Sequence, residues 1–87
     1  MSTIAGSLEQ LEALSRQFAQ QGEAVDQLTS TIRGQLDNAL WQGPAADRFR
    51  STWSSEFEPV LRKLQAGLQE AGTEVQRRKD ALQTAGS

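Results

Sequence analysis

Acidic pairs are the residues of this chain whose types and spacing could do chemistry. Glu9 lies close to Glu12 in the sequence, and Glu56 lies close to Glu58, so each pair could supply a general acid beside a general base. Such a pair needs a shaped pocket that excludes water and moves the two pKa values apart. We expect these glutamates to face outward from a thin helical structure, where no such pocket forms.

Histidine and cysteine are both absent from the sequence. The serines therefore have no imidazole base to activate them, and neither thiolate chemistry nor a disulfide is available. The usual zinc-binding constellations are excluded for the same reason. The sequence predicts no catalytic residue, no metal site and no cofactor, and hence a protein that is not an enzyme.

The length and charge of the chain limit its class. A chain of 87 residues has room for one small domain, residues 1–87. A formal net charge of −2 argues against a nucleic-acid binder, which would carry a basic surface. The N-terminus has neither a cationic start nor an apolar run, and no stretch is long enough to span a membrane. We therefore expect no cleaved signal peptide and no stable membrane insertion.

The stretch at residues 40–47, Leu-Trp-Gln-Gly-Pro-Ala-Ala-Asp, interrupts two runs of helical spacing near the middle of the chain. Glycine adopts a positive φ most readily, and proline suits the first turn of a helix, where its missing N–H has no consequence. Asp47 places a negative charge near the positive end of the new helix dipole. These signals predict a turn at residues 41–43 between two helices.

The first half of the chain has the apolar spacing of one long helix. Its apolar residues follow one another in steps of four and three, with Ser15, Gly22 and Thr29 at the missing positions of the series. The series consists of Ile4, Leu8, Leu11, Phe18, Val25, Ile32, Leu36 and Ala39. Leu14 and Leu28 form a second apolar line beside it, so the stripe is wider than one neighbouring helix needs.

The second half repeats this pattern. Its apolar series consists of Phe49, Trp53, Phe57, Val60, Leu64, Leu68, Ala71, Val75 and Leu82. Pro59 falls inside the run, removes one backbone hydrogen bond and crowds the carbonyl of Ser55, which predicts a bend. A break into two helices is the alternative, but the apolar spacing continues across Pro59 and favours one kinked helix.

We therefore predict an all-α fold, an antiparallel two-helix hairpin. The first helix covers about residues 7–40 and the second about residues 44–82, with short flexible tails. Folding the chain about the turn predicts that Phe18 meets Gly67, Gly22 meets Lys63 and Leu64, Val25 meets Val60, and Ile32 meets Trp53. The expected i,i+4 ion pairs are Glu12–Arg16, Glu58–Arg62 and Glu74–Arg78. Arg48 and Arg50 are expected on the outer face, where they aid solubility.

Two helices that touch along one line bury only one flank of each. The second apolar lines, Leu14 and Leu28 with Phe57, Leu61 and Leu68, would remain in water in a monomer. Two hairpins that pair as a four-helix bundle would cover them, which predicts a dimer. The predicted core and dimer-interface residues are Leu11, Leu14, Phe18, Val25, Leu28, Ile32, Phe49, Trp53, Phe57, Val60, Leu61, Leu64 and Leu68.

The tripeptide Trp41-Gln42-Gly43 between two helices, followed by Pro-Ala-Ala-Asp, Phe49 and Trp53, resembles the turn of the WXG family. These early-secretory-antigen-like (ESAT-like) proteins are substrates of type VII secretion in actinobacteria and other Gram-positive bacteria. The resemblance implies a homodimer, or a heterodimer with a second WXG-family protein. It also implies export as a folded dimer by the type VII translocase ATPase, hence a secreted protein with a cytoplasmic pool before export.

The family's export signature has two halves, and this chain matches one of them. Trp41 and Gly43 match the turn motif. As a large aromatic beside a loop, Trp41 could have a packing role alone, or packing together with partner contact. The C-terminal Tyr-x-x-x-Asp/Glu motif is incomplete, because Gln76 stands four residues before Asp80 and the sequence contains no tyrosine. Two interpretations remain open: a partner carries the tyrosine, or recognition uses other contacts.

The resemblance predicts a secreted protein that acts through protein–protein binding. One alternative is an escort subunit for a Tyr-bearing partner or a larger effector. Another is an intracellular adaptor hairpin that is not exported. The near-neutral charge and the lack of a basic amphipathic face give little support to a membrane-perturbing role.

Overall fold

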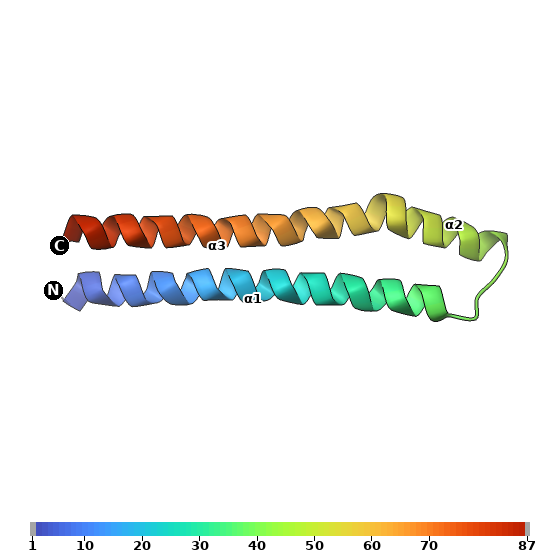
Figure 1. Ribbon diagram of the computed structural model, residues 1–87, viewed down its shortest axis with the longest axis horizontal. Coiled ribbons are helices and arrows are strands. Elements are labelled where there is room, and N and C mark those ends of the chain that lie inside the picture. The colour runs from blue at the N-terminus through green and yellow to red at the C-terminus, as the bar shows by residue number, and fades with distance from the viewer. Residues whose placement is uncertain (1, 87) are drawn as a thin grey trace.

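The computed structural model of the protein describes residues 2–86, and the side chains of residues 7–85. Two helical arms run antiparallel and lie side by side, joined by a loop at one end, with the chain ends together at the other (Figure 1). The molecule is a rod of 65 × 17 × 12 Å. The predicted all-α hairpin is confirmed, and the described residues contain no strand.

Four helical segments make up the two arms. They are α1 (Ser2–Asn38), α2 (Pro44–Thr52), the π-helical turn η1 (Trp53–Phe57) and α3 (Glu58–Gly86). Residues 39–43 form the loop between α1 and α2. Compared with the expected bounds, α1 begins before residue 7 and ends at Asn38 rather than at Leu40. The side chain of Ile4, a member of the predicted apolar series, lies outside the described residues.

The start of α2 follows from the local chemistry of its first residues. Gly43 has φ 110° and ψ 175°, a conformation that residues with a Cβ rarely adopt, and it precedes Pro44 in the first turn. The N–H of Asp47 donates to the carbonyl of Gly43 at 3.0 Å and closes that turn. The side chain of Ala46 is fully buried, so the small residue allows α2 to lie close to its neighbours.

The second arm changes its helical winding just before Pro59. In η1 the N–H of Glu58 donates to the carbonyl of Trp53, five residues back. The hydroxyls of Ser54 and Ser55 both donate to the carbonyl of Ser51, a bond that bends helices. A π turn contains one additional residue, so it rotates α2 by about 100° relative to α3. Figure 1 shows the arm bending here.

The two arms meet along a line of small residues. Ser15, Gly22 and Thr29 follow one another at intervals of seven residues on α1, and Gly72 lies opposite on α3. Thr29 is 1% exposed, and both glycines are buried. The Ser15 hydroxyl donates to the carbonyl of Gly72 at 3.2 Å. These four residues, the seam, allow the helix backbones to approach closely. The three that belong to α1 occupy the positions at which its apolar series has gaps.

The predicted register between the arms is wrong by about one helical turn. Phe18 lies against Gly72, because a Cβ on that glycine would stand 3.2 Å from the Cβ of Phe18, whereas Gly67 has no neighbour within 4 Å. Gly22 approaches Gln65 and Gln69 rather than Lys63 and Leu64. The first turn of α2 projects beyond the end of α1 (Figure 1). That overhang and the additional residue of η1 together displace α3 along α1.

Ion pairs across the seam follow the same corrected register. They are Glu12–Lys79, Asp26–Arg62 and Arg33–Glu58. The predicted Glu12–Arg16 and Glu74–Arg78 pairs are present. The predicted Glu58–Arg62 pair is absent from the described part of the chain, because each residue is drawn to α1 instead. The carboxylate of Glu58 accepts a bond from Nε of Arg33 at 2.7 Å and is 15% exposed, so it does not face outward as expected.

Candidate functional site

The hairpin has two different flanks, which can be followed from Gly22. At about 100° per residue, Ala19 and Val25 lie about 60° to either side of Gly22. Leu68 and Gln69 lie about 40° and 60° to either side of Gly72. Because the arms are antiparallel, Val25 and Leu68 fall on one flank of the hairpin, and Ala19 and Gln69 fall on the other. One flank is therefore apolar and the other polar.

The apolar flank extends over both arms, and the described residues of the chain cover it only in part. We call it the apolar face; its members are Leu14, Phe18, Val25, Leu28, Ile32, Phe57, Val60, Leu61, Leu64 and Leu68. Leu28 is 52% exposed, Leu64 is 49% exposed and Val60 is 64% exposed. Large side chains at this exposure on neighbouring turns form a contiguous patch of the kind that marks interaction sites.

The predicted core and interface residues divide into two groups. The exposed group contains Leu14, Leu28, Phe49, Phe57, Val60 and Leu64. The half-buried group contains Leu11, Phe18, Val25, Ile32, Trp53, Leu61 and Leu68. The expectation that Val60 packs against Val25 inside the hairpin is wrong, since Val60 is among the most exposed. Leu61 and Leu68, expected to remain in water, are half-buried. They lie about 20° and 40° around the helix from Gly72, on the side of α3 that meets α1.

The charged residues of α1 avoid the apolar face. At about 100° per residue they project near the seam or onto the polar flank. They are Glu9, Glu12, Arg16, Glu23, Asp26, Arg33 and Asp37. The outer edge of α1 beside Leu14 and Leu28 carries only uncharged side chains, such as Gln17, Gln21 and Ala24. A partner could thus cover this edge without desolvating a charge.

The loop at the closed end of the hairpin presents Trp41. Trp41 is 43% exposed, and its ring lies 5.8 Å from the ring of Phe49, centroid to centroid, at a tilt of 47°. Leu40 is fully exposed. The loop therefore exposes two large apolar side chains to solvent. One of them, Trp41, also contacts the ring of Phe49 in α2.

Arg50 holds the backbone of this loop, contrary to the expectation that it lies on the outer face only for solubility. Its guanidinium donates to the carbonyls of Leu36, Ala39 and Trp41 at 3.0, 3.2 and 2.8 Å. The last carbonyls of a helix lack partners within that helix, and α1 has no basic residue in its last turn. The sequence does carry a signal for this role. The last turn of α1 has no basic residue, and an arginine follows soon after the helix ends.

Beneath the loop, Trp53 lines a cavity of about 250 Å³ together with Leu36, Asp37, Arg50 and Glu58. Its Nε1 is buried and finds no hydrogen-bond partner among the described residues. Its ring lies 6.3 Å from that of Phe57. The π turn has thus rotated Trp53 toward α1, where its ring lines the cavity beside Leu36 and its N–H makes no hydrogen bond with a described residue.

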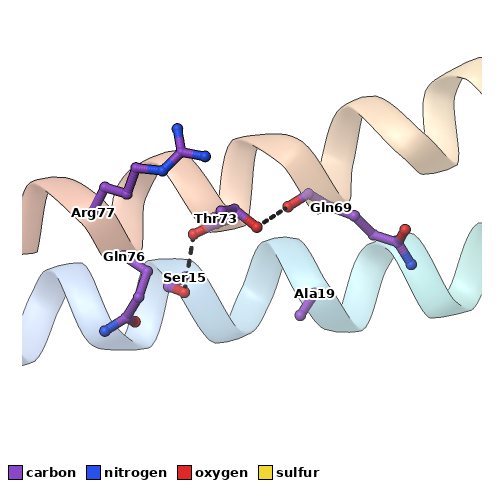
Figure 2. Close-up of a pocket in the computed structure, with 7 residues that line it drawn as sticks. Ser15, Ala19, Gln69, Thr73, Gln76 and Arg77 are labelled. Atoms are coloured by element: carbon purple, nitrogen blue, oxygen red, sulfur yellow. Dashed lines mark hydrogen bonds between the residues drawn. The ribbon is translucent and has the colours of Figure 1, made fainter.

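The polar flank carries a groove of about 400 Å³ near the open end of the hairpin. Ser15 and Ala19 of α1 line it with Gln69, Thr73, Gln76 and Arg77 of α3 (Figure 2). The Thr73 hydroxyl donates to the carbonyl of Gln69 at 3.1 Å. Gln76 also donates to the carboxylate of Asp80 at 3.2 Å, so the two residues at the positions of the C-terminal motif bond to one another along α3.

The remaining chemistry of the described residues is limited. No three of their aspartates and glutamates gather in a way that could hold a metal ion. None of the helices is both long enough and apolar enough to cross a membrane. The structure therefore concentrates what is unusual in this chain at the apolar face and the Trp41 loop.

Two antiparallel helices, a tryptophan–glycine loop and an uncovered apolar face define a small helical-hairpin protein. The chain belongs to the WXG100 family, described as proteins of 100 residues with WXG, whose sequence model matches residues 3–87. The family resemblance predicted from the turn is therefore confirmed. WXG100 proteins are small, non-enzymatic, type VII-associated helical proteins that typically pair with other WXG proteins. No curated protein and no solved structure matches the chain significantly.

Proposed function

We propose that this hairpin pairs through its apolar face with a second WXG chain and is exported as a folded dimer by a type VII secretion system. The observation that carries the proposal is the apolar face, which leaves Leu28, Val60 and Leu64 in water on one flank. Burying such side chains is favourable by about 1.5–3 kcal/mol each when burial is complete. A second amphipathic hairpin is the simplest partner that covers a long, flat face of this kind.

The Trp41 loop is the proposed contact with the export machinery. Its ring is half-exposed at the end of the rod, outside the apolar face, and so it remains available after two hairpins pair. Large aromatic side chains beside a loop are frequent anchors of protein interfaces. Export of a folded dimer through this contact explains how a surface at the loop and a surface along the helices serve one function.

A partner that carries the tyrosine is the form of this proposal that the composition favours. The chain contains no tyrosine, and Gln76 stands at the corresponding position before Asp80. A heterodimer would supply the missing half of the export signature from its second subunit. A homodimer requires recognition through other contacts.

The test is purification from the native host, with mass spectrometry of the proteins that accompany the chain. Recovery of a second WXG protein in equal amount supports the heterodimer, and recovery of the chain alone as a dimer supports the homodimer. Detection in culture supernatant should disappear when the type VII ATPase is deleted. Export that persists without the ATPase would overturn the proposed route.

Trp41→Ala separates export from assembly. We expect the secreted fraction to fall about tenfold or more, since losing an aromatic anchor costs about 1.4 kcal/mol or more at an interface. Dimerisation, measured by light scattering of the cytoplasmic pool, should persist because Trp41 lies off the apolar face. Gln42→Ala, in the same loop, is the control and should be exported normally. Loss of the dimer together with export would mean that Trp41 only packs.

A further inference from the structure

The loop between α1 and α2 is held by few backbone hydrogen bonds. The described ones at its two ends run from the N–H of Ala39 to the carbonyl of Gln35 and from the N–H of Asp47 to the carbonyl of Gly43. Between them, residues 40–42 have no regular secondary structure. The conformation that presents Trp41 therefore depends on side chains from outside the loop.

Arg50 supplies those contacts from α2. Nε reaches the carbonyl of Leu36, Nη2 that of Ala39 and Nη1 that of Trp41, so one planar group joins the last turn of α1 to the middle of the loop. A guanidinium offers five donors in a fixed plane, whereas a lysine offers one compact ammonium. Its charge also lies at the negative end of the α1 dipole.

Phe49, the neighbour of Arg50, holds the side chain of the same tryptophan. Its ring lies 5.8 Å from that of Trp41. One turn of α2 thus fixes both the backbone carbonyl of Trp41, through Arg50, and its ring, through Phe49. Removing the Arg50 contacts would leave the ring held only by its contact with Phe49, with the chain on either side free to move.

We propose that Arg50 is a positioning residue that clamps the loop and keeps Trp41 in the orientation from which it contacts a partner. This clamp, the three hydrogen bonds from Arg50 to backbone carbonyls, concerns only the conformation of the loop. Its consequence for export rests on the proposed function, in which Trp41 contacts the secretion machinery.

The clamp can be measured with Trp41 as the only tryptophan. Trp53→Phe provides that background, because phenylalanine keeps a ring in the cavity and removes an N–H that has no partner among the described residues. In this background we compare Arg50→Gln, Arg50→Lys and the control Arg48→Gln. Arg48 is exposed, and no described hydrogen bond joins it to the loop.

Arg50→Gln should raise the acrylamide quenching constant of Trp41 by up to about twofold, the limit reached if a residue that is 43% exposed becomes fully exposed by local opening. Arg50→Lys should behave like Arg50→Gln, because one ammonium cannot bond three carbonyls. Helix content and dimer mass should stay unchanged in all variants, which separates loop release from unfolding. Equal quenching in Arg50→Gln and Arg48→Gln would overturn the clamp, and full rescue by lysine would overturn the role of the planar fork.

The same variants, with Trp53 restored, distinguish the clamp from the proposed function in a secretion assay. Reduced export of Arg50→Gln with an intact dimer supports both. Normal export of Arg50→Gln, when Trp41→Ala is retained in the cell, would show that export needs the ring but not its positioning, and would overturn the link between them. Normal export of Trp41→Ala would overturn the export role of Trp41, while the quenching result would still decide the clamp.

Discussion

The residues of the seam are small, and their size determines how closely the two arms pack. Thr29 is 1% exposed, and its hydroxyl donates to the carbonyl of Val25, within its own helix, at 2.7 Å. In a two-arm hairpin, only the opposite arm can cover such a side chain so completely. A polar residue at this position is tolerated because its hydroxyl is satisfied locally, and it is small enough for the backbones to stay close.

Thr29→Leu tests this interpretation. A heptad pattern favours leucine here, but the structure has no room for it, so we expect a loss of about 1–3 kcal/mol in the free energy of unfolding from overpacking. Thr29→Val keeps the shape of the side chain and is the control, expected to change stability by less than about 1 kcal/mol. Denaturant unfolding followed by circular dichroism measures both. A stabilised leucine variant would mean that the seam is not closely packed at Thr29.

At the scale of the helices, the glycines report where the arms touch. Gly22 and Gly72 meet atoms of the opposite arm, and Gly34 and Gly67 meet none within 4 Å. A glycine inside a helix lowers helix stability unless its small size is needed for packing. Replacing each glycine with alanine therefore tests the register of the hairpin, because only a glycine that contacts the opposite arm should resist the added methyl group.

Gly67→Ala should stabilise the protein by about 1 kcal/mol, the difference in helix propensity, because space around this position is open. Gly72→Ala is its counterpart in the same helix and should destabilise the hairpin. Its Cβ would stand 3.2 Å from the carbonyl oxygen of Ser15, and backbone cannot move aside without separating the arms. Thermal unfolding of the two variants gives the comparison. The reverse order of stabilities would restore the register in which Phe18 meets Gly67.

At the scale of the whole molecule, the hairpin divides its polar and apolar contacts between two flanks. The cross-arm ion pairs Asp26–Arg62 and Glu12–Lys79 join residues outside the apolar face, while the large side chains of that face remain in water. Ion pairs that keep at least one partner in water contribute little to stability, typically less than about 1 kcal/mol each. Much of the apolar surface that could stabilise the rod is thus available only to a partner.

Leu28→Glu combined with Leu64→Glu should weaken dimerisation about a hundredfold, or about 2.7 kcal/mol, because covering the apolar face would then desolvate two carboxylates. Ser30→Glu is the control and should leave the dimer intact, because Ser30 is exposed on the other flank of α1. Light scattering after size exclusion at several concentrations measures the effect. If the unaltered chain is a stable folded monomer on its own, homodimerisation is excluded. The partner of the apolar face would then have to be a different protein.

The sequence by itself determined the two-helix fold and the place of its turn. Both depend on local interactions: the spacing of apolar residues selects the helix, Gly43 accepts a positive φ, and Pro44 suits the first turn of α2. The same residues also identified the family, because its motif coincides with the turn.

Only the tertiary structure decided the register of the arms, the small-residue seam and the role of Arg50. All three depend on contacts between residues that are distant in the chain. The overhang of α2 and the additional residue of η1 shift the register, so that Phe18 lies against Gly72. The turn before α2 brings Arg50 back to the last carbonyls of α1. Spacing along a helix tells which residues share a face, but it does not tell which face meets the other arm. The seam therefore formed where the apolar series has its gaps, since small residues let two backbones approach, and the larger side chains were left for a partner.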